Sequence, residues 1–177
     1  GSREAFAVTS NGVYTISDSN PNSGALWQRI TGNLFQIQQA PFGLTALSNT
    51  KLIDLTSIAA DWRYVIPDSA TSTSTHPMLY VGGEGGVYRS TDKGATWTLF
   101  PEPEAGSINN NPTLPSPGGA LPNVRVNDLD MSIGNVDPTT GRSIAAAGDP
   151  NILLATTFGR GSFAIRLAPV VFANQLA

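Results

Sequence analysis

Hydrophobic and polar residues alternate in three short stretches of the chain, and each stretch turns on glycine. The clearest runs from Leu79 to Ser90, where two alternating segments flank the glycine-rich residues 82–86. Alternation with a period of two predicts a half-buried β-strand, and glycine accepts the backbone conformations that a tight hairpin turn needs. An earlier copy covers residues 6–16 and a later copy covers residues 153–165. The pattern therefore predicts three β-hairpins.

The three hairpins belong to a longer repeat. Val13 and Val87 lie 74 residues apart, as do Tyr80 and Leu154. Residues 24–27 and 94–97 share the pattern Gly-Ala-x-Trp, and a further strand is predicted before each of the last two hairpins, at 55–60 and 124–131. In order, the chain then contains three strands, four strands and three strands. A four-stranded antiparallel unit repeated in tandem is the blade of a β-propeller.

The predicted fold is all-β, with about three propeller blades at residues 5–35, 51–100 and 122–167. We interpret residues 1–4 as an expression scar and lead-in, and residues 168–177 as a trailing strand or linker. Polar loops at 36–50, 67–77 and 101–122 lengthen the repeat, and residues 36–39 or 144–147 could hold one turn of helix. Propellers close with about 4–8 blades, so we expect an incomplete propeller whose partner is the remaining blades or a second copy.

Composition narrows the classes of function. Hydrophobic residues make up 40% of the 177 residues, which is enough for a buried core, and the net charge is −3. A negative chain argues against nucleic-acid binding, which requires a basic surface. The sequence contains no cysteine, so it has no disulfide framework and no thiolate metal site. Its apolar runs are too short for us to expect membrane insertion.

One motif carries a family resemblance. Residues 90–97 read Ser-Thr-Asp-Lys-Gly-Ala-Thr-Trp. This stretch resembles the Asp-box (BNR repeat), Ser-x-Asp-x-Gly-x-x-Trp, of sialidase-like and sortilin-like β-propellers, with matches at Ser90, Asp92, Gly94 and Trp97. The resemblance implies a propeller fold and a structural role for the box. A short aspartate side chain can accept hydrogen bonds from backbone N–H groups further along the turn, and a tryptophan can bury the base of a hairpin.

No catalytic residue is predicted, although an enzyme is left open. His76 is the only histidine, and residues 82–86 lack the Lys-Ser/Thr and the helix start of a phosphate-binding loop. The arginines that sialidase chemistry requires do not fall in a recognisable family motif. Glycosidases use two carboxylates at a fixed separation, and Asp61, Asp128 and Asp130 stay candidates for that role because they lie near predicted inner strands.

Two binding sites are hypotheses at this stage. Asp18, Asn20 and Asn22 place oxygen side chains at alternate positions, as a calcium loop does, although the stretch departs from the helix–loop–helix pattern and an Asx-rich turn without metal is the alternative. Calcium is thus the only cofactor considered. Residues Trp62-Arg63-Tyr64 form a candidate ligand platform, because aromatic faces stack on sugars and arginine pairs with carboxylates. Packing against a neighbouring blade is the alternative for these three residues.

These observations favour a non-catalytic binding or scaffold module of a large secreted or cell-surface protein, and a bacterial source is expected. The expected ligand is a glycan or a protein. The first alternative is a fragment of a sialidase-like or xyloglucanase-like glycoside hydrolase, and the second is a factor in protein-complex assembly.

Overall fold

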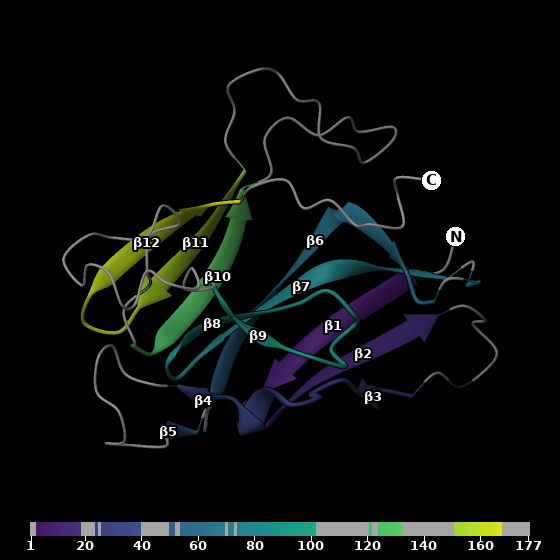
Figure 1. Cartoon of the computed structure of the whole chain (residues 1–177), viewed down its shortest axis with the longest axis horizontal. Coiled ribbons are helices and arrows are strands. Elements are labelled where there is room, and N and C mark those ends of the chain that lie inside the picture. The colour runs from purple at the N-terminus through teal and green to yellow at the C-terminus, as the bar shows by residue number, and fades with distance from the viewer. Residues whose placement is uncertain are drawn as a thin grey trace, which may run out of the picture.

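The computed structural model describes residues 3–18, 24, 26–39, 50–51, 54–69, 71–72, 74–101, 121, 124–132 and 151–167. Every regular element in them is a strand except one short 3₁₀ turn, η1 (Leu34–Gln36), so the prediction of an all-β chain is confirmed. Figure 1 shows the strands gathered into separate antiparallel sheets that fan out from one another.

The first sheet has the order β1-β2-β3 and is built around the first predicted hairpin. Its register pairs Val8 with Val13 and Thr9 with Gly12, so the turn lies at Ser10 and Asn11. The strands are β1 (Arg3–Thr9), β2 (Gly12–Asp18) and β3 (Gln28–Arg29).

The central sheet has four strands in the order β6-β7-β8-β9. Its first strand is longer than the predicted 55–60 and continues to Pro67. The strands are β6 (Leu55–Pro67), β7 (Thr75–Gly83), β8 (Gly86–Ser90) and β9 (Thr98–Phe100).

The third sheet has the order β10-β11-β12 and contains the last predicted hairpin. The strands are β10 (Val126–Ser132), β11 (Ile152–Thr157) and β12 (Gly161–Arg166). The expected succession of three, four and three strands is present. A small ribbon of β4 (Gln38–Gln39) and β5 (Thr50–Lys51) also forms in the predicted loop 36–50 and ends one residue beyond it.

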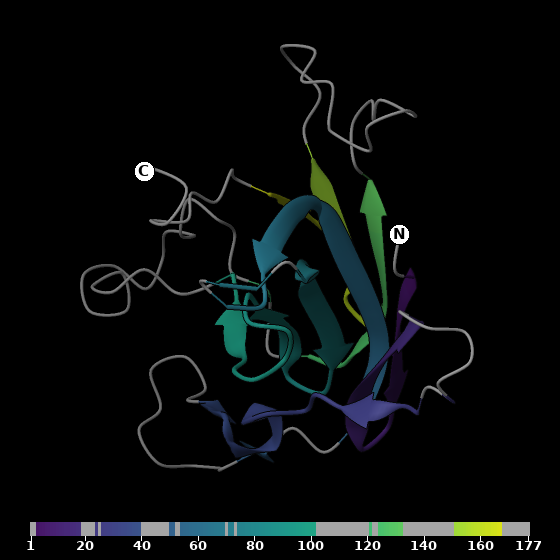
Figure 2. The ribbon, with the colours of Figure 1, turned by 90° about the vertical axis from the view of Figure 1, so that its right-hand side faces the viewer.

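Two hydrophobic cores cover the two faces of the central sheet. One joins it to the first sheet and includes Val13, Leu79 and Val81; the other joins it to the third sheet and includes Tyr80 and residues of β10–β12. Neighbouring residues of β7 therefore enter opposite cores, as the period-two geometry of a strand requires. Figure 2, turned by 90° from Figure 1, shows β6 curving over the other strands of its sheet.

Candidate functional site

Strand β6 carries a wide bulge near its end. Asp61 pairs with Met78 of β7, and the next paired residue is Ile66, which lies opposite His76. Four residues, 62–65, are thus left out of the ladder between two paired positions. Bulges redirect side chains that would otherwise alternate regularly across the sheet.

A buried ion pair holds the bulge. The side chain of Asp61 is fully buried and pairs with Arg63, whose own side chain is 9% exposed. One Asp61 oxygen accepts hydrogen bonds from the Arg63 amide at 3.1 Å and from its Nε at 2.8 Å, and the other accepts from Nη2. A bidentate pair of this kind fixes geometry as well as neutralising the buried charge. The backbone at Trp62 is therefore clamped between two bonded neighbours.

The bulge presents Trp62 to solvent. Its side chain is 45% exposed, and its ring lies 6.1 Å from the ring of Phe6 on β1, with the planes tilted by 48°. Val65 in the same bulge is also exposed. Of the three residues predicted as a platform, Trp62 is available to a ligand, Arg63 is engaged with Asp61, and the side chain of Tyr64 lies outside the described part of the structure.

The turn from Ser90 to Trp97 is closed by side chains of its own residues. The Ser90 hydroxyl donates to Oδ1 of Asp92 at 2.9 Å and accepts from the Gly94 amide at 2.8 Å. Asp92 also accepts a hydrogen bond from the Thr96 amide at 2.8 Å and another from the Thr96 hydroxyl. The Asp92 carboxylate thus caps the backbone N–H of Thr96, and the Ser90 hydroxyl caps that of Gly94.

These hydrogen bonds set the acidity of Asp92. Partial burial by itself raises the pKa of the carboxyl, but the bonds from the Thr96 hydroxyl and amide and from the Ser90 hydroxyl outweigh it. The pKa of Asp92 therefore lies below its usual value of 3.8. A carboxyl that is held ionised and fully engaged by donors is suited to holding a turn rather than to donating a proton.

The same turn also docks on the segment that follows the first sheet. The Trp97 indole, 1% exposed, donates to the carbonyl oxygens of Gly94 at 3.1 Å and Ile30 at 3.2 Å. The Trp97 amide donates to Oδ1 of Asn33 at 2.7 Å, and Nδ2 of Asn33 donates back to the Trp97 carbonyl at 3.3 Å. The turn from Ser90 to Trp97 therefore joins the central sheet to the segment after the first sheet, through a contact between residues 64 positions apart.

Two glycines allow this close approach. Gly94 has φ +82°, and a Cβ built there would lie 2.3 Å from the Ile30 carbonyl oxygen. Gly32 on the facing segment has φ +47°, and a Cβ there would lie 2.3 Å from the Ala95 carbonyl oxygen. Each glycine thus makes room for the other segment's backbone, in a conformation that other residues adopt only with strain.

Lys93 adds an electrostatic link at the same place. It has φ +57°, and its Nζ lies 3.0 Å from Glu4 of β1 and 3.3 Å from Asp68 after β6. Burial lowers the pKa of Lys93, but the two carboxylates raise it by more, so the ammonium is held above its usual pKa of 10.5. The lysine therefore bridges the first and central sheets as a cation.

The carboxylates that the sequence left open as catalytic candidates each accept a hydrogen bond from another group of the chain. Asp61 is sealed by Arg63, Asp128 accepts a hydrogen bond from the Ser57 hydroxyl at 3.0 Å, and Asp130 accepts one from its neighbour's amide. His76 is buried, with Nδ1 2.9 Å from the carbonyl oxygen of Pro77. Each of these groups has a structural partner.

The residues predicted to bind calcium lie at and beyond the end of β2. Asn20 and Asn22 lie outside the described residues, and of Asp18 only the backbone at the end of β2 is described. Within the described ranges, no group of three or more histidine, aspartate or glutamate side chains could hold a metal ion. The described part of the chain also has no helix that is long and apolar enough to span a bilayer.

The sequence does not predict the residues that contact Trp62 and the turn from Ser90 to Trp97. Gly32 and Asn33 lie in no motif that the sequence shows, and Phe6 is predicted only as a position of the first hairpin. Their role depends on a docking partner far away in the sequence, which no local pattern reveals. Searches of protein-family models, of curated proteins and of solved structures found no match to this chain.

Proposed function

We propose that this chain is a non-catalytic binding and scaffold module made of β-propeller blades, belonging to a secreted or cell-surface protein. Three antiparallel sheets stacked face to face, an internal repeat and an Asp-box-like turn between β8 and β9 support the blade interpretation. The scaffold role is supported by the way the box is used: its hydrogen bonds tie one sheet to the next.

The observation that carries a binding role is the bulge at Trp62. Its aromatic ring is backed by Phe6 and half exposed, while its backbone is fixed by the pair of Asp61 and Arg63. A rigid aromatic face stacks on the apolar face of a sugar ring without first having to be ordered, which favours affinity. The proposed ligand is therefore a glycan.

A glycosidase role has less support, because Asp61, Asp128 and Asp130 are each engaged with other groups of the chain. A role in protein-complex assembly has no residue that favours it over glycan binding. Calcium at Asp18, Asn20 and Asn22 stays a proposal that rests on the sequence alone. The proposed partners beyond the glycan are the remaining propeller blades or a second copy of the chain.

Titration calorimetry tests the glycan platform with two defined probes, a xyloglucan oligosaccharide and a sialylated trisaccharide. We expect one of them to bind and Trp62→Ala to weaken binding about tenfold, the equivalent of one aromatic stacking contact of roughly 1.4 kcal/mol. Phe158→Ala is the matched control, since Phe158 is an exposed aromatic on the turn between β11 and β12. Equal affinity in the wild type and in Trp62→Ala would overturn the platform, as would binding of neither probe.

A further inference from the structure

The central sheet packs against another sheet on each of its two faces. On the face toward the first sheet it buries Leu79, Tyr88 and Trp97, and on the face toward the third sheet it buries Met78 and Tyr80. Each face has its own set of residues, drawn from alternate positions of the same strands. An interface between two sheets thus has two different halves, one contributed by each sheet.

The internal repeat assigns one of these halves to the outer face of the first sheet. By the 74-residue repeat Tyr14 corresponds to Tyr88, and by the shared Gly-Ala-x-Trp pattern Trp27 corresponds to Trp97. Trp97 is 1% exposed and packs in the core shared with the first sheet and the segment after it, whereas Trp27 is 50% exposed and Tyr14 is half-buried.

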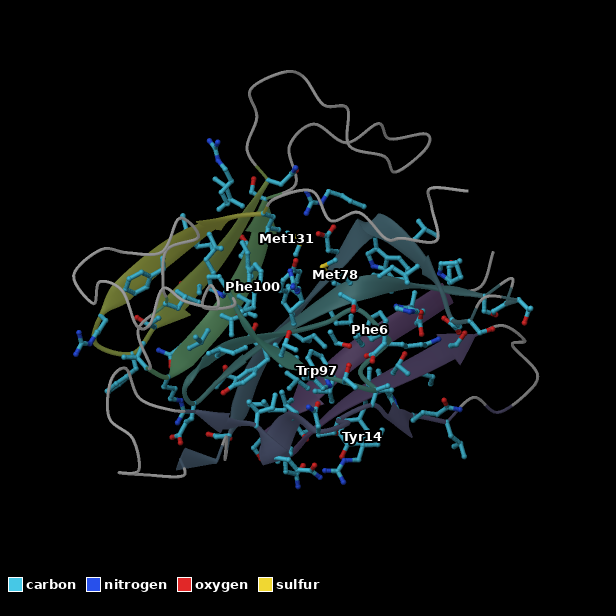
Figure 3. All side chains as sticks on the ribbon, viewed as in Figure 1. Phe6, Tyr14, Met78, Trp97, Phe100 and Met131 are labelled. Atoms are coloured by element: carbon cyan, nitrogen blue, oxygen red, sulfur yellow. The ribbon has the colours of Figure 1, made fainter. Side chains whose placement is uncertain are left out.

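The direction of these side chains follows from their neighbours. Val13 is fully buried in the core shared with the central sheet, so Tyr14, the next residue of β2, points to the opposite face. The register places Ala7 and Arg29 directly beside it on that face. Figure 3 labels Trp97 among the stacked strands and Tyr14 nearer the margin of the molecule. Among the described strands, the main contact of the first sheet with another sheet is that of β1 with β6.

The third sheet carries the other half. Leu154 corresponds to Tyr80, and Ile152 corresponds to Met78, by the same separation in the sequence. In the central sheet these positions are buried by the next sheet, but Leu154 is 38% exposed. The residue between them, Leu153, is fully buried against the central sheet. The outer face of the third sheet is thus equivalent to the central-sheet face that packs on a following sheet.

We propose that the outer face of the third sheet of one copy packs on the outer face of the first sheet of a second copy. The two faces are the two halves of an interface that the chain already builds twice within itself, so a second copy supplies the missing half at each end. A two-fold axis then repeats the contact, and the pair closes. This inference rests on the stacked-blade interpretation, but it involves neither Trp62 nor the glycan.

Light scattering at increasing concentration of the full chain is the first test. We expect the mass to rise from 18.5 kDa to twice that value. Trp27→Glu and Leu154→Glu should each raise the concentration at half-association at least tenfold, because each buries a charge in the contact. Phe158→Glu is the control: Phe158 is 72% exposed but lies at the hairpin tip, and its variant should associate like the wild type. Circular dichroism verifies that each variant is folded.

Cross-linking tests which faces meet. The chain has no cysteine, so Ala7→Cys and Leu154→Cys each introduce a single thiol, one on each outer face. A short bis-maleimide should link the two variants when they are mixed and should not link either variant to itself. A chain that stays at 18.5 kDa at every concentration overturns the proposal. Self-linking of the Leu154→Cys variant also overturns it, because like faces would then meet, and so does a head-to-tail series longer than two copies.

Discussion

Replacing Gly94 by alanine tests whether the turn from Ser90 to Trp97 joins the first and central sheets. The new Cβ would lie 2.3 Å from the Ile30 carbonyl oxygen and 2.8 Å from the Ile30 Cβ. Because the nearest obstacle is backbone rather than the end of a flexible side chain, the turn and the facing segment must move apart. The φ of +82° adds a separate penalty for any residue with a Cβ.

The magnitude can be assembled from these parts. A left-handed conformation costs about 1–2 kcal/mol for a residue with a Cβ. Separating the two segments weakens the bond from the Trp97 indole to Ile30 and the two bonds between Trp97 and Asn33, each of which contributes about 0.5–1.5 kcal/mol. With partial loss of all three, Gly94→Ala should lower the free energy of unfolding by about 3–5 kcal/mol.

Gly159 provides the matched control. Its φ of +75° is close to that of Gly94, but a Cβ there would meet nothing within 4 Å. Gly159→Ala should therefore lose only the conformational part, about 1–2 kcal/mol. Urea unfolding followed by circular dichroism measures both variants. If the two lose equal stability, the steric coupling between the sheets is refuted, and only local backbone strain remains.

Four further results are expected. Trp97→Ala should lower the free energy of unfolding by about 3–5 kcal/mol, and Trp27→Ala by much less, as measured by urea unfolding at low protein concentration. Asp92→Ala should cost about 1–3 kcal/mol without changing glycan affinity in the calorimeter. Because the folded pKa of Asp92 is lowered, the stability it contributes is present above pH 3.8 and lost as the pH falls through its lower folded value, so acid unfolding curves of this variant and the wild type should converge there. The stability that Lys93 contributes depends on pH in the opposite direction, because its folded pKa is raised. This contribution is complete below pH 10.5 and is lost as the pH rises through the folded pKa. The difference in unfolding free energy between the wild type and Lys93→Met should therefore vanish in alkali. Calcium added to chelated protein should raise the melting temperature, and Asp18→Ala should abolish the rise; identical curves with calcium and chelator would exclude the site.

Local chemistry accounts for what the sequence predicts well. The three hairpins follow from alternation and glycine turns, which act over a few residues. The bonds within the turn from Ser90 to Thr96 likewise involve residues at most four positions apart. Such features depend little on the rest of the fold, so a single sequence is enough to anticipate them.

The features that escaped prediction depend on distant partners. Strands β4 and β5 have two residues each and no apolar alternation, so a polar loop was the natural expectation there. Asp61 lies just beyond the predicted strand 55–60 and is a catalytic candidate from the sequence, whereas β6 continues to Pro67 and buries Asp61 beside Arg63. The contact between Asn33 and Trp97 spans 64 positions of sequence, and no local pattern around either residue predicts it.

The three tryptophans give this chain a built-in set of optical reporters. Trp97 is shielded and hydrogen-bonded, while Trp27 and Trp62 are each about half in water, so their emission should differ in wavelength and in accessibility to iodide. Variants that keep one indole and replace the other two by phenylalanine would separate three events in the same molecule. The emission of Trp97 would report separation of the first and central sheets. The emission of Trp62 would report binding of a sugar, and that of Trp27 would report association with a second copy.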